Sequence, residues 1–257
     1  MRKQRLFFRL ACLAAALCLL CACGAKQQPQ NTSAPSEDAV PTAVPTPSPT
    51  PVPVPTAQVE QCAGAYFPDI SGSPNLYAAV EFTNTGVVPA AVESIRVTIA
   101  FDDQTVKETF TPPLAENDIV EPGARSTVAV WIPYTKSTPS EGAAFSVSAE
   151  VTLTASTDRD KDPLTVENLV LVQNYPGFST VSGRLQNPTD DRDYSLTLVY
   201  LSFYDETGAL LGVTHFTKNL AVPATESRDF VTHLRALPID GLPEKTARIV
   251  ARGIGIR

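Results

Sequence analysis

Acidic side chains outnumber basic ones in this sequence, with 27 Asp and Glu against 20 Lys and Arg and a net charge of −7. In the stretch 158–162, three Asp alternate with Arg and Lys. Carboxylate oxygens at this spacing could bind Ca²⁺, which takes about 6–8 oxygen ligands. An EF-hand loop would need Gly and Glu where this chain has Pro163 and Leu169. We therefore favour a solvated linker here, and the same for the second acidic loop at 190–193.

Zinc chemistry has few candidates, whereas Ser and Asp are plentiful enough for a Ser-His-Asp triad to be possible in composition. The chain has two histidines, His215 and His233, and catalytic zinc usually needs about three protein ligands. No Gly-x-Ser-x-Gly motif accompanies them to indicate a serine hydrolase. We expect no catalytic residue, metal site or cofactor. Paired carboxylates that hydrolyse a glycan remain an alternative, because their geometry arises only in the folded chain.

The sharpest chemical motif is a cysteine near the N-terminus. A basic start is followed by the apolar segment 10–22 and by the run Leu20-Cys21-Ala22-Cys23-Gly24. This order is typical of a signal peptide with a small-residue cleavage site. The apolar segment is shorter than the ~20 residues that a membrane-spanning helix needs. The run resembles the lipobox of bacterial lipoproteins, although Cys21 stands where Ala or Ser is more usual.

The lipobox resemblance implies removal of residues 1–22 and a diacylglyceryl thioether on Cys23, often with a further acyl chain such as palmitate. Two chains anchor a protein stably in a membrane, whereas one binds only marginally. We therefore expect a lipid-anchored protein on the extracytoplasmic face of the cell membrane. An uncleaved anchor helix and an ordinary secretory signal are the alternatives.

Charge and cysteine content restrict the mature chain further. Cleavage before Cys23 removes basic residues and leaves a still more acidic body, which argues against nucleic acid as a partner. Cys62 is then the one cysteine without lipid, so no disulfide can form within the chain. We expect Cys62 to be a small buried hydrophobe; the alternative is a thiol that reacts or pairs between molecules.

Residues 23–57 form a separate segment by composition. After the lipid-bearing cysteine this segment has few large apolar side chains, and 40–56 is a Pro- and Thr-rich repeat. Such a sequence cannot bury a core and favours extended polyproline II. We expect a disordered linker that spaces the rest of the chain from the membrane.

From residue 58 onward, short alternating strands recur in two similar halves. Asn84 and Asn187 each end such a strand, and Phe101 and Phe203 each precede an acidic turn at nearly the same spacing. Period-two alternation indicates half-buried strands. We expect an all-β chain with two tandem Ig-like β-sandwich domains, at 58–156 and 164–257.

The second half also resembles a known family. Its segments Val181-Ser-Gly-Arg-Leu-Gln-Asn187 and Leu201-Ser-Phe-Tyr-Asp205 are similar to the FxLYD-type domain of bacterial envelope lipoproteins. The first half has only Ile99-Ala-Phe-Asp-Asp103 at the matching place. The resemblance implies a β-sandwich at the cell surface and assigns no catalytic residue.

One strand of the second half is apolar on both faces and is our candidate partner surface. Ser94, Arg96 and Thr98 in the first half are replaced there by the residues Leu196, Leu198 and Tyr200, and Tyr204 follows. An exposed apolar patch marks an interface; alternatively, this face packs on the first half or on a covering strand.

The whole pattern favours a non-enzymatic binding or structural module that contacts an envelope protein or wall component. A wall or glycan hydrolase and a small-ligand-binding lipoprotein are the alternatives.

Overall fold

The computed structural model describes most of the chain after the Pro-rich segment. The described residues are 53–68, 74–112, 118–134, 138–156, 161–175, 178–234, 237, 239 and 241–257. They belong to one compact unit of the chain, residues 50–257. The signal segment, Cys23 and most of the expected linker lie outside the described residues. Within the described part, no helix has the length and apolar character needed to cross a membrane.

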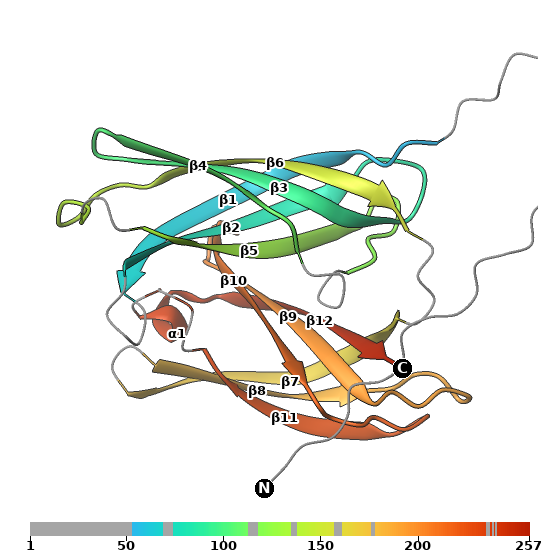
Figure 1. Ribbon diagram of the computed structural model, residues 1–257. Coiled ribbons are helices and arrows are strands. Elements are labelled where there is room, and N and C mark those ends of the chain that lie inside the picture. The colour runs from blue at the N-terminus through green and yellow to red at the C-terminus, as the bar shows by residue number, and fades with distance from the viewer. Residues whose placement is uncertain are drawn as a thin grey trace, which may run out of the picture. The chain divides into compact units, whose positions relative to one another are not determined.

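The expectation of an all-β chain is confirmed. The one helix of the described part, α1 (Leu242–Lys245), is a single turn, and the paired strands are all antiparallel. The strands form several sheets, and Figure 1 shows two groups of them, the earlier strands in one group and the later strands in the other.

Strands from the first half pair only with one another. One three-stranded sheet has the order β1-β2-β5 and the other has the order β4-β3-β6. Their bounds are β1 Ala57–Pro68, β2 Pro74–Asn84, β3 Ala90–Phe101, β4 Gln104–Phe110, β5 Arg125–Pro133 and β6 Ser146–Ala155. Between the two sheets lies a core of fully buried side chains such as Phe82, Ile95 and Ile99.

Strands from the second half repeat this order. The strands β7-β8-β11 are neighbours in that sequence, as are β10-β9-β12. Their bounds are β7 Lys161–Tyr175, β8 Phe178–Gln186, β9 Leu196–Tyr204, β10 Leu210–Lys218, β11 Ser227–His233 and β12 Arg248–Ile256. Here the two trios join into one six-stranded sheet, because the first residues of β7 pair with the end of β12.

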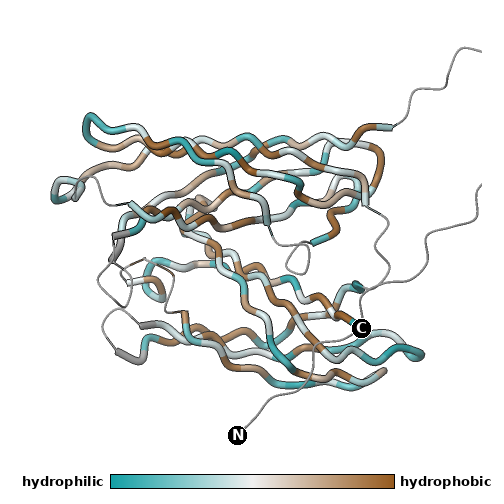
Figure 2. Tube along the Cα trace, viewed as in Figure 1, coloured by the Kyte–Doolittle hydropathy of each residue, from teal (hydrophilic) through white to brown (hydrophobic). Residues whose placement is uncertain are grey.

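Alternation along the strands decides which side chains enter the cores. In β3, Ile95, Val97 and Ile99 are fully buried, whereas Arg96 between them is exposed. Figure 2 shows this alternation of apolar and polar positions along strands of both halves. Strand β9 differs, because every residue after Leu196 is buried on whichever face it lies.

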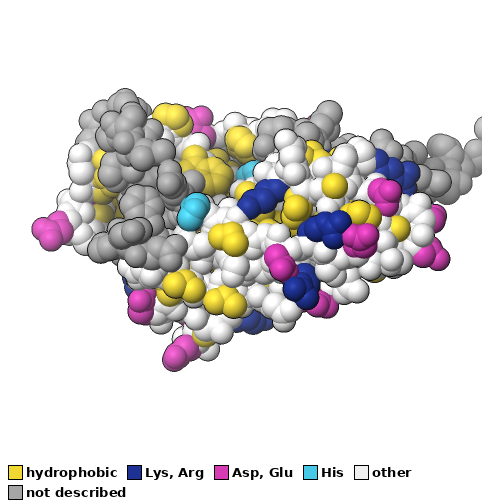
Figure 3. Space-filling model, turned by 90° about the horizontal axis from the view of Figure 1, so that it is seen from below, with side chains coloured by type: hydrophobic (Ala, Val, Ile, Leu, Met, Phe, Trp, Pro, Cys, Tyr) yellow, Lys and Arg dark blue, Asp and Glu magenta, His cyan; other side chains and the backbone are white. Residues whose placement is uncertain are grey.

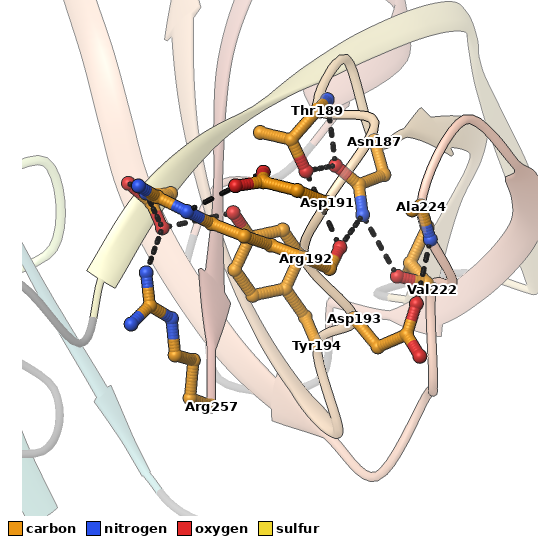
Figure 4. A network of polar contacts seen from close by, with 10 residues as sticks. Asn187, Thr189, Asp191, Arg192, Asp193, Tyr194, Val222, Ala224 and Arg257 are labelled. Carbon is orange, nitrogen blue, oxygen red and sulfur yellow. Dashed lines mark hydrogen bonds and ion pairs between the residues drawn. The ribbon is translucent and has the colours of Figure 1, made fainter.

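A buried asparagine closes the corresponding corner of each half. The Asn84 amide donates to the carbonyls of Val88 (2.9 Å) and Val120 (2.8 Å). The Asn187 amide donates to the carbonyls of Arg192 (2.6 Å) and Val222 (3.1 Å), as Figure 4 shows. Both asparagines are fully buried. Each side-chain oxygen accepts a backbone N–H two residues later, which fixes the turn after the strand.

Substitution of Asn187 tests this corner. Asn187→Ala should lower the free energy of unfolding by about 1–3 kcal/mol, because it leaves the buried Val222 carbonyl without this donor. Urea denaturation followed by circular dichroism measures the loss. The exposed neighbour Asp190 supplies the control, since Asp190→Ala should change the free energy by less than about 0.5 kcal/mol. Equal effects of the two substitutions would contradict a structural role for the amide.

Candidate functional site

The proposed partner surface lies inside the described unit. Leu198, Tyr200 and Tyr204 are 0%, 6% and 2% exposed, and Leu196 is half-buried. On this face of β9, Tyr204 and its neighbour Ser202 contact Glu81 and Thr127 of sheet β1-β2-β5, so packing on the first half, one alternative left open by the sequence, occurs at this end of the strand. Leu198 and Tyr200 cluster with Ile254 of β12. These four residues therefore form no exposed apolar patch in this structure. We call the contact between sheet β1-β2-β5 and the six-stranded sheet the seam.

A tyrosine–carboxyl pair lies at the centre of the seam. The Tyr204 hydroxyl donates to Oε1 of Glu81 at 2.7 Å. Glu81 is only 4% exposed, and its Oε2 has no hydrogen-bond partner. Burial, reinforced by the adjacent Glu81, raises the pKa of Tyr204 to about 12. Tyr204 thus remains a neutral donor at physiological pH. Arg125 lies 3.9 Å from the same oxygen of Glu81, so Tyr204 supplies the close hydrogen bond that offsets much of the cost of burying this carboxyl.

Further polar contacts cross the seam. The Tyr77 hydroxyl donates to the Val213 carbonyl and accepts from the Val213 N–H, both at 2.6 Å. Gln61 likewise uses both side-chain groups, donating to the Gly208 carbonyl at 3.1 Å and accepting from the Leu210 N–H at 2.8 Å. The Thr127 and Ser202 hydroxyls lie 2.9 Å apart. These contacts fix the register of β10 and its preceding turn against the first half.

Aromatic rings fill the space beside these polar contacts. The centroid of the Trp131 ring lies 5.6 Å from that of Tyr77 and 6.3 Å from that of His215. His215 in turn lies 5.6 Å from Tyr200. The other histidine, His233, is on β11, at the opposite end of the six-stranded sheet from β10. The fold therefore places the two histidines on strands at opposite ends of one sheet, and His215 packs among aromatic rings.

At one end of the seam is a cleft of about 400 Å³. Its charged lining residues include Asp118, Lys161, Asp162 and Arg252. Asp118 forms an ion pair with Arg252 at 2.7 Å and accepts a hydrogen bond from the Ser126 hydroxyl at 3.3 Å. Burial raises the pKa of Asp118, and the charge of Arg252 opposes this shift.

Asp162 is the centre of a second network near the cleft, drawn in Figure 4. Arg192 lies 3.0 Å from both carboxylate oxygens, the Tyr194 hydroxyl donates at 2.9 Å, and Arg257 lies 3.5 Å away. Partial burial alone would raise the pKa of Asp162. The hydrogen bonds from Tyr194 and Arg192 and the charges of both arginines outweigh burial and hold this pKa below its usual value.

The two acidic loops differ from a calcium site. Residues 158–160 lie outside the described residues, and the Asp162 carboxylate is occupied by arginines and a tyrosine. In the second loop, Asp193 accepts the Ala224 N–H at 2.8 Å and Asp191 lies 3.6 Å from Arg192. Within the described part, no group of three or more His, Cys, Asp and Glu is arranged to hold a metal.

The cleft carboxylates have the opposite pKa shifts that acid–base catalysis uses. Each is nevertheless held by an arginine, and an ion-paired carboxylate is a poor proton acceptor. The arrangement can neutralise buried charge, bind a polar group at the cleft and hold the two halves together. Cys62 is half-buried, and burial raises the pKa of its thiol, which disfavours the reactive thiolate.

Sequence reasoning missed the seam residues of the first half. Tyr77, Ala79 and Glu81 alternate with the core residues of β2, so they lie on the face of that strand that points away from the first core. The composition of this face of β2 could have indicated its burial, because it has Tyr and Ala where a solvent-facing strand usually has charged residues. No protein-family model and no curated protein matches the chain.

Removing the Tyr204 hydroxyl tests the seam. Tyr204→Phe should lower the free energy of unfolding by about 2 kcal/mol, because the buried Glu81 loses its hydrogen bond. Urea denaturation provides the measurement. Tyr134→Phe is the matched control, because its hydroxyl makes a long bond of 3.4 Å to Gln104 away from the seam. In a Glu81→Gln background the Tyr204→Phe loss should shrink; equal losses in both backgrounds would contradict the coupling.

Replacement of Asp162 gives a pH-dependent prediction. The pKa of Asp162 is lower in the folded than in the unfolded chain, so its ionised form adds stability above about pH 4, and this stability is lost as pH falls through the folded pKa. Asp162→Asn should therefore cost about 1–3 kcal/mol at pH 7 and less at pH 3. Urea titrations at several pH values measure the difference.

Asp118 provides the control of opposite sign. Its pKa is raised, so the contribution of Asp118 to stability falls as pH rises from the unfolded pKa towards the folded pKa. The penalty of Asp118→Asn relative to the wild type should thus decrease with rising pH, whereas that of Asp162→Asn increases. The same pH slope for both variants would contradict the assigned environments.

Proposed function

We propose that this chain is a lipid-anchored protein of the extracytoplasmic membrane face, whose body is a non-enzymatic structural and binding module. The observation that carries the proposal is the seam. Its buried side chains, above all Tyr77, Glu81 and Tyr204, are hydrogen-bonded across the two halves and join them in one compact unit. Because the polar groups of the seam bond to each other, the two halves keep one arrangement and their outer surfaces stay fixed relative to each other. Fixed outer surfaces suit a structural or binding module.

Two features support a pair of tandem Ig-like sandwich domains, at 58–156 and 164–257. Both halves have the same strand order, and both close the same corner with a buried asparagine. The asparagine of the second half ends the strand that resembles the FxLYD-type domain. We infer that the two halves arose by duplication of one such sandwich.

The anchor rests on the residues around Cys23. The basic start, the short apolar segment and the small residues before this cysteine fit cleavage and lipidation. Lipid on Cys23 and the Pro-rich segment up to residue 57 would place the body away from the membrane surface. An envelope protein or a wall component is then the partner within reach.

A hydrolase would have to use the carboxylates of the cleft. Asp118 and Asp162 line the same cleft and their pKa values shift in opposite directions, as a glycan hydrolase requires. Arg252 and Arg192 neutralise them, however, so neither is free to activate water. We therefore favour binding at this cleft over catalysis. Its charged lining fits a small polar ligand.

Substitution of the proposed lipid-bearing cysteine tests the anchor. In a cell fractionation, the wild-type protein should be in the membrane pellet and should enter the detergent phase of a Triton X-114 extraction. Cys23→Ser should move it to the aqueous phase, because the lipid chains supply the membrane affinity. Cys62→Ser is the matched control and should leave the partition unchanged. A Cys23→Ser protein that still enters the detergent phase would contradict lipid anchoring.

A further inference from the structure

Three arginines lie at one edge of the seam: Arg125 begins β5, and Arg248 and Arg252 are on β12. Arg252 donates to the backbone carbonyl of Arg125 at 3.0 Å. The guanidinium of Arg248 lies 4.5 Å from the centre of the Tyr204 ring. Tyr204 in turn bonds to Glu81, whose carboxyl is 3.9 Å from Arg125. A chain of contacts thus connects the three arginines, which we call the arginine cluster.

The arginine cluster presents positive charge to solvent because its acidic partners are buried. The side chain of Arg125 is 63% exposed, whereas that of Glu81 is 5% exposed. Arg252 pairs with Asp118 at 2.7 Å, and their side chains are 32% and 9% exposed. Arg248 is exposed and has no carboxylate partner among the residues that the structure describes. The guanidinium groups are therefore accessible, whereas the carboxyl groups are withdrawn from solvent.

Two other exposed arginines are neutralised at the surface itself. Arg96 pairs with Glu150 at 3.0 Å and Arg184 with Asp229 at 2.7 Å, and these acidic side chains are 74% and 72% exposed. Figure 3 shows a similar mixture on one face of the molecule, where several basic side chains lie beside acidic ones. Charges beyond about 8 Å are largely screened at physiological ionic strength. The arginine cluster can therefore attract an anion locally, although the chain as a whole is acidic.

The spacing of the cluster favours a polymer over a single small anion. Arg248 and Arg252 are four residues apart on β12, so alternation places them on the same face. Four residues of a strand span about 13 Å, which is farther than one phosphate or carboxylate group can bridge. A chain that carries repeated anionic groups can contact both arginines. It would pass over Val250, which lies between them and is 38% exposed.

Phosphate is the anionic group that best fits the Arg125 end of the cluster. A hollow of about 40 Å³ is lined there by Arg125, Arg252 and Glu81 among others. One oxygen of Glu81 is hydrogen-bonded to Tyr204 and the other is buried, so the arginines supply the accessible charge. A guanidinium binds phosphate through paired N–H donors. A tetrahedral phosphate can accept from two arginines on different strands, whereas the oxygens of a carboxylate lie in one plane.

We propose that the arginine cluster binds a linear polymer that carries repeated phosphate groups and lies along β12. This inference rests on the binding role in the proposed function and specifies the chemistry of the wall component. We expect the Pro-rich linker to hold the body away from the membrane surface. The site is therefore assigned to a polymer and not to the phosphates of lipid head groups.

Inorganic polyphosphate is the probe that tests the site in the full-length chain. Fluorescein-labelled polyphosphate is titrated with the protein in a neutral detergent, and its anisotropy should rise as the complex forms. The double variant Arg125→Gln/Arg248→Gln should bind at least about 10-fold more weakly, because two charge-assisted contacts are lost. Arg96→Gln/Arg184→Gln is the matched control. It removes the same two charges from exposed positions elsewhere and should change the affinity less than about two-fold.

A single substitution keeps the test independent of the seam. Arg248 contacts the Tyr204 ring and no carboxylate, so Arg248→Gln should leave the fold intact even if the Arg125 substitution disturbs it. This variant should bind polyphosphate at least about 3-fold more weakly. Circular dichroism verifies the folding of each variant.

Four results would overturn the proposal. They are no binding by the wild type, equal weakening in the two double variants, equal affinity for polyglutamate of the same length, and binding to phosphatidylglycerol vesicles but not to polyphosphate. Anchoring is scored separately, by the detergent partition of Cys23→Ser. A failed anchor leaves the polyphosphate titration unchanged, and a failed titration with normal partition refutes this site alone.

Discussion

Strand β9 imposes the constraint on which the rest of this structure depends, because it is apolar on both faces and both faces must be covered. One face completes the core of the second half, with Val199, Leu201 and Phe203 fully buried. The other face holds Tyr200 and Tyr204, and at the Tyr204 end it contacts sheet β1-β2-β5. A single strand thus belongs to the core of its own half and to the contact with the other half. For this reason two sets of sheets that share no backbone pairing still form one compact unit.

The polar groups of the seam fix one relative position of the two sheets. Apolar packing alone would tolerate several relative positions of the two sheets, since the hydrophobic effect is not directional. The Tyr77 hydroxyl bonds to both backbone groups of Val213, and Tyr204 supplies the close hydrogen bond of the buried Glu81 carboxyl. Displacement of the sheets by one residue would leave these groups without partners. Buried hydrogen bonds of this kind select one arrangement more than they add to stability.

Much of this fold follows from local sequence patterns. Period-two alternation predicted strands, and Asn84 and Asn187 were expected to end two of them, as they do at the ends of β2 and β8. The apolar outer face of β9 was also recognised, and covering by the first half was one of the two alternatives. The sequence left open whether the outer face of β9 is exposed or packed against another part of the chain, because the answer depends on a surface distant in sequence.

Apart from the Tyr and Ala composition of one face of β2, no local pattern identifies the seam partners, for the same physical reason. Glu81 looks like an ordinary solvent-facing residue in its strand, and its burial results from the approach of Tyr204, 123 residues later. Asp118 and Arg252 meet only because the halves pack together. The same distinction applies to function. The N-terminal motif is local and supports an anchor, whereas tertiary packing decides which surfaces are available for binding.

The most direct measurement of the central claim is the cooperativity of unfolding in the full-length chain. The single tryptophan, Trp131, lies at the seam on the first-half side, so its fluorescence reports on the first half and the contact. Hydrogen exchange of the amides of β8 and β11 reports on the far sheet of the second half. If the seam makes the halves one unit, both probes should give a single coincident transition in urea. Two separated transitions, with β8 and β11 still protected after the Trp131 signal is lost, would contradict it.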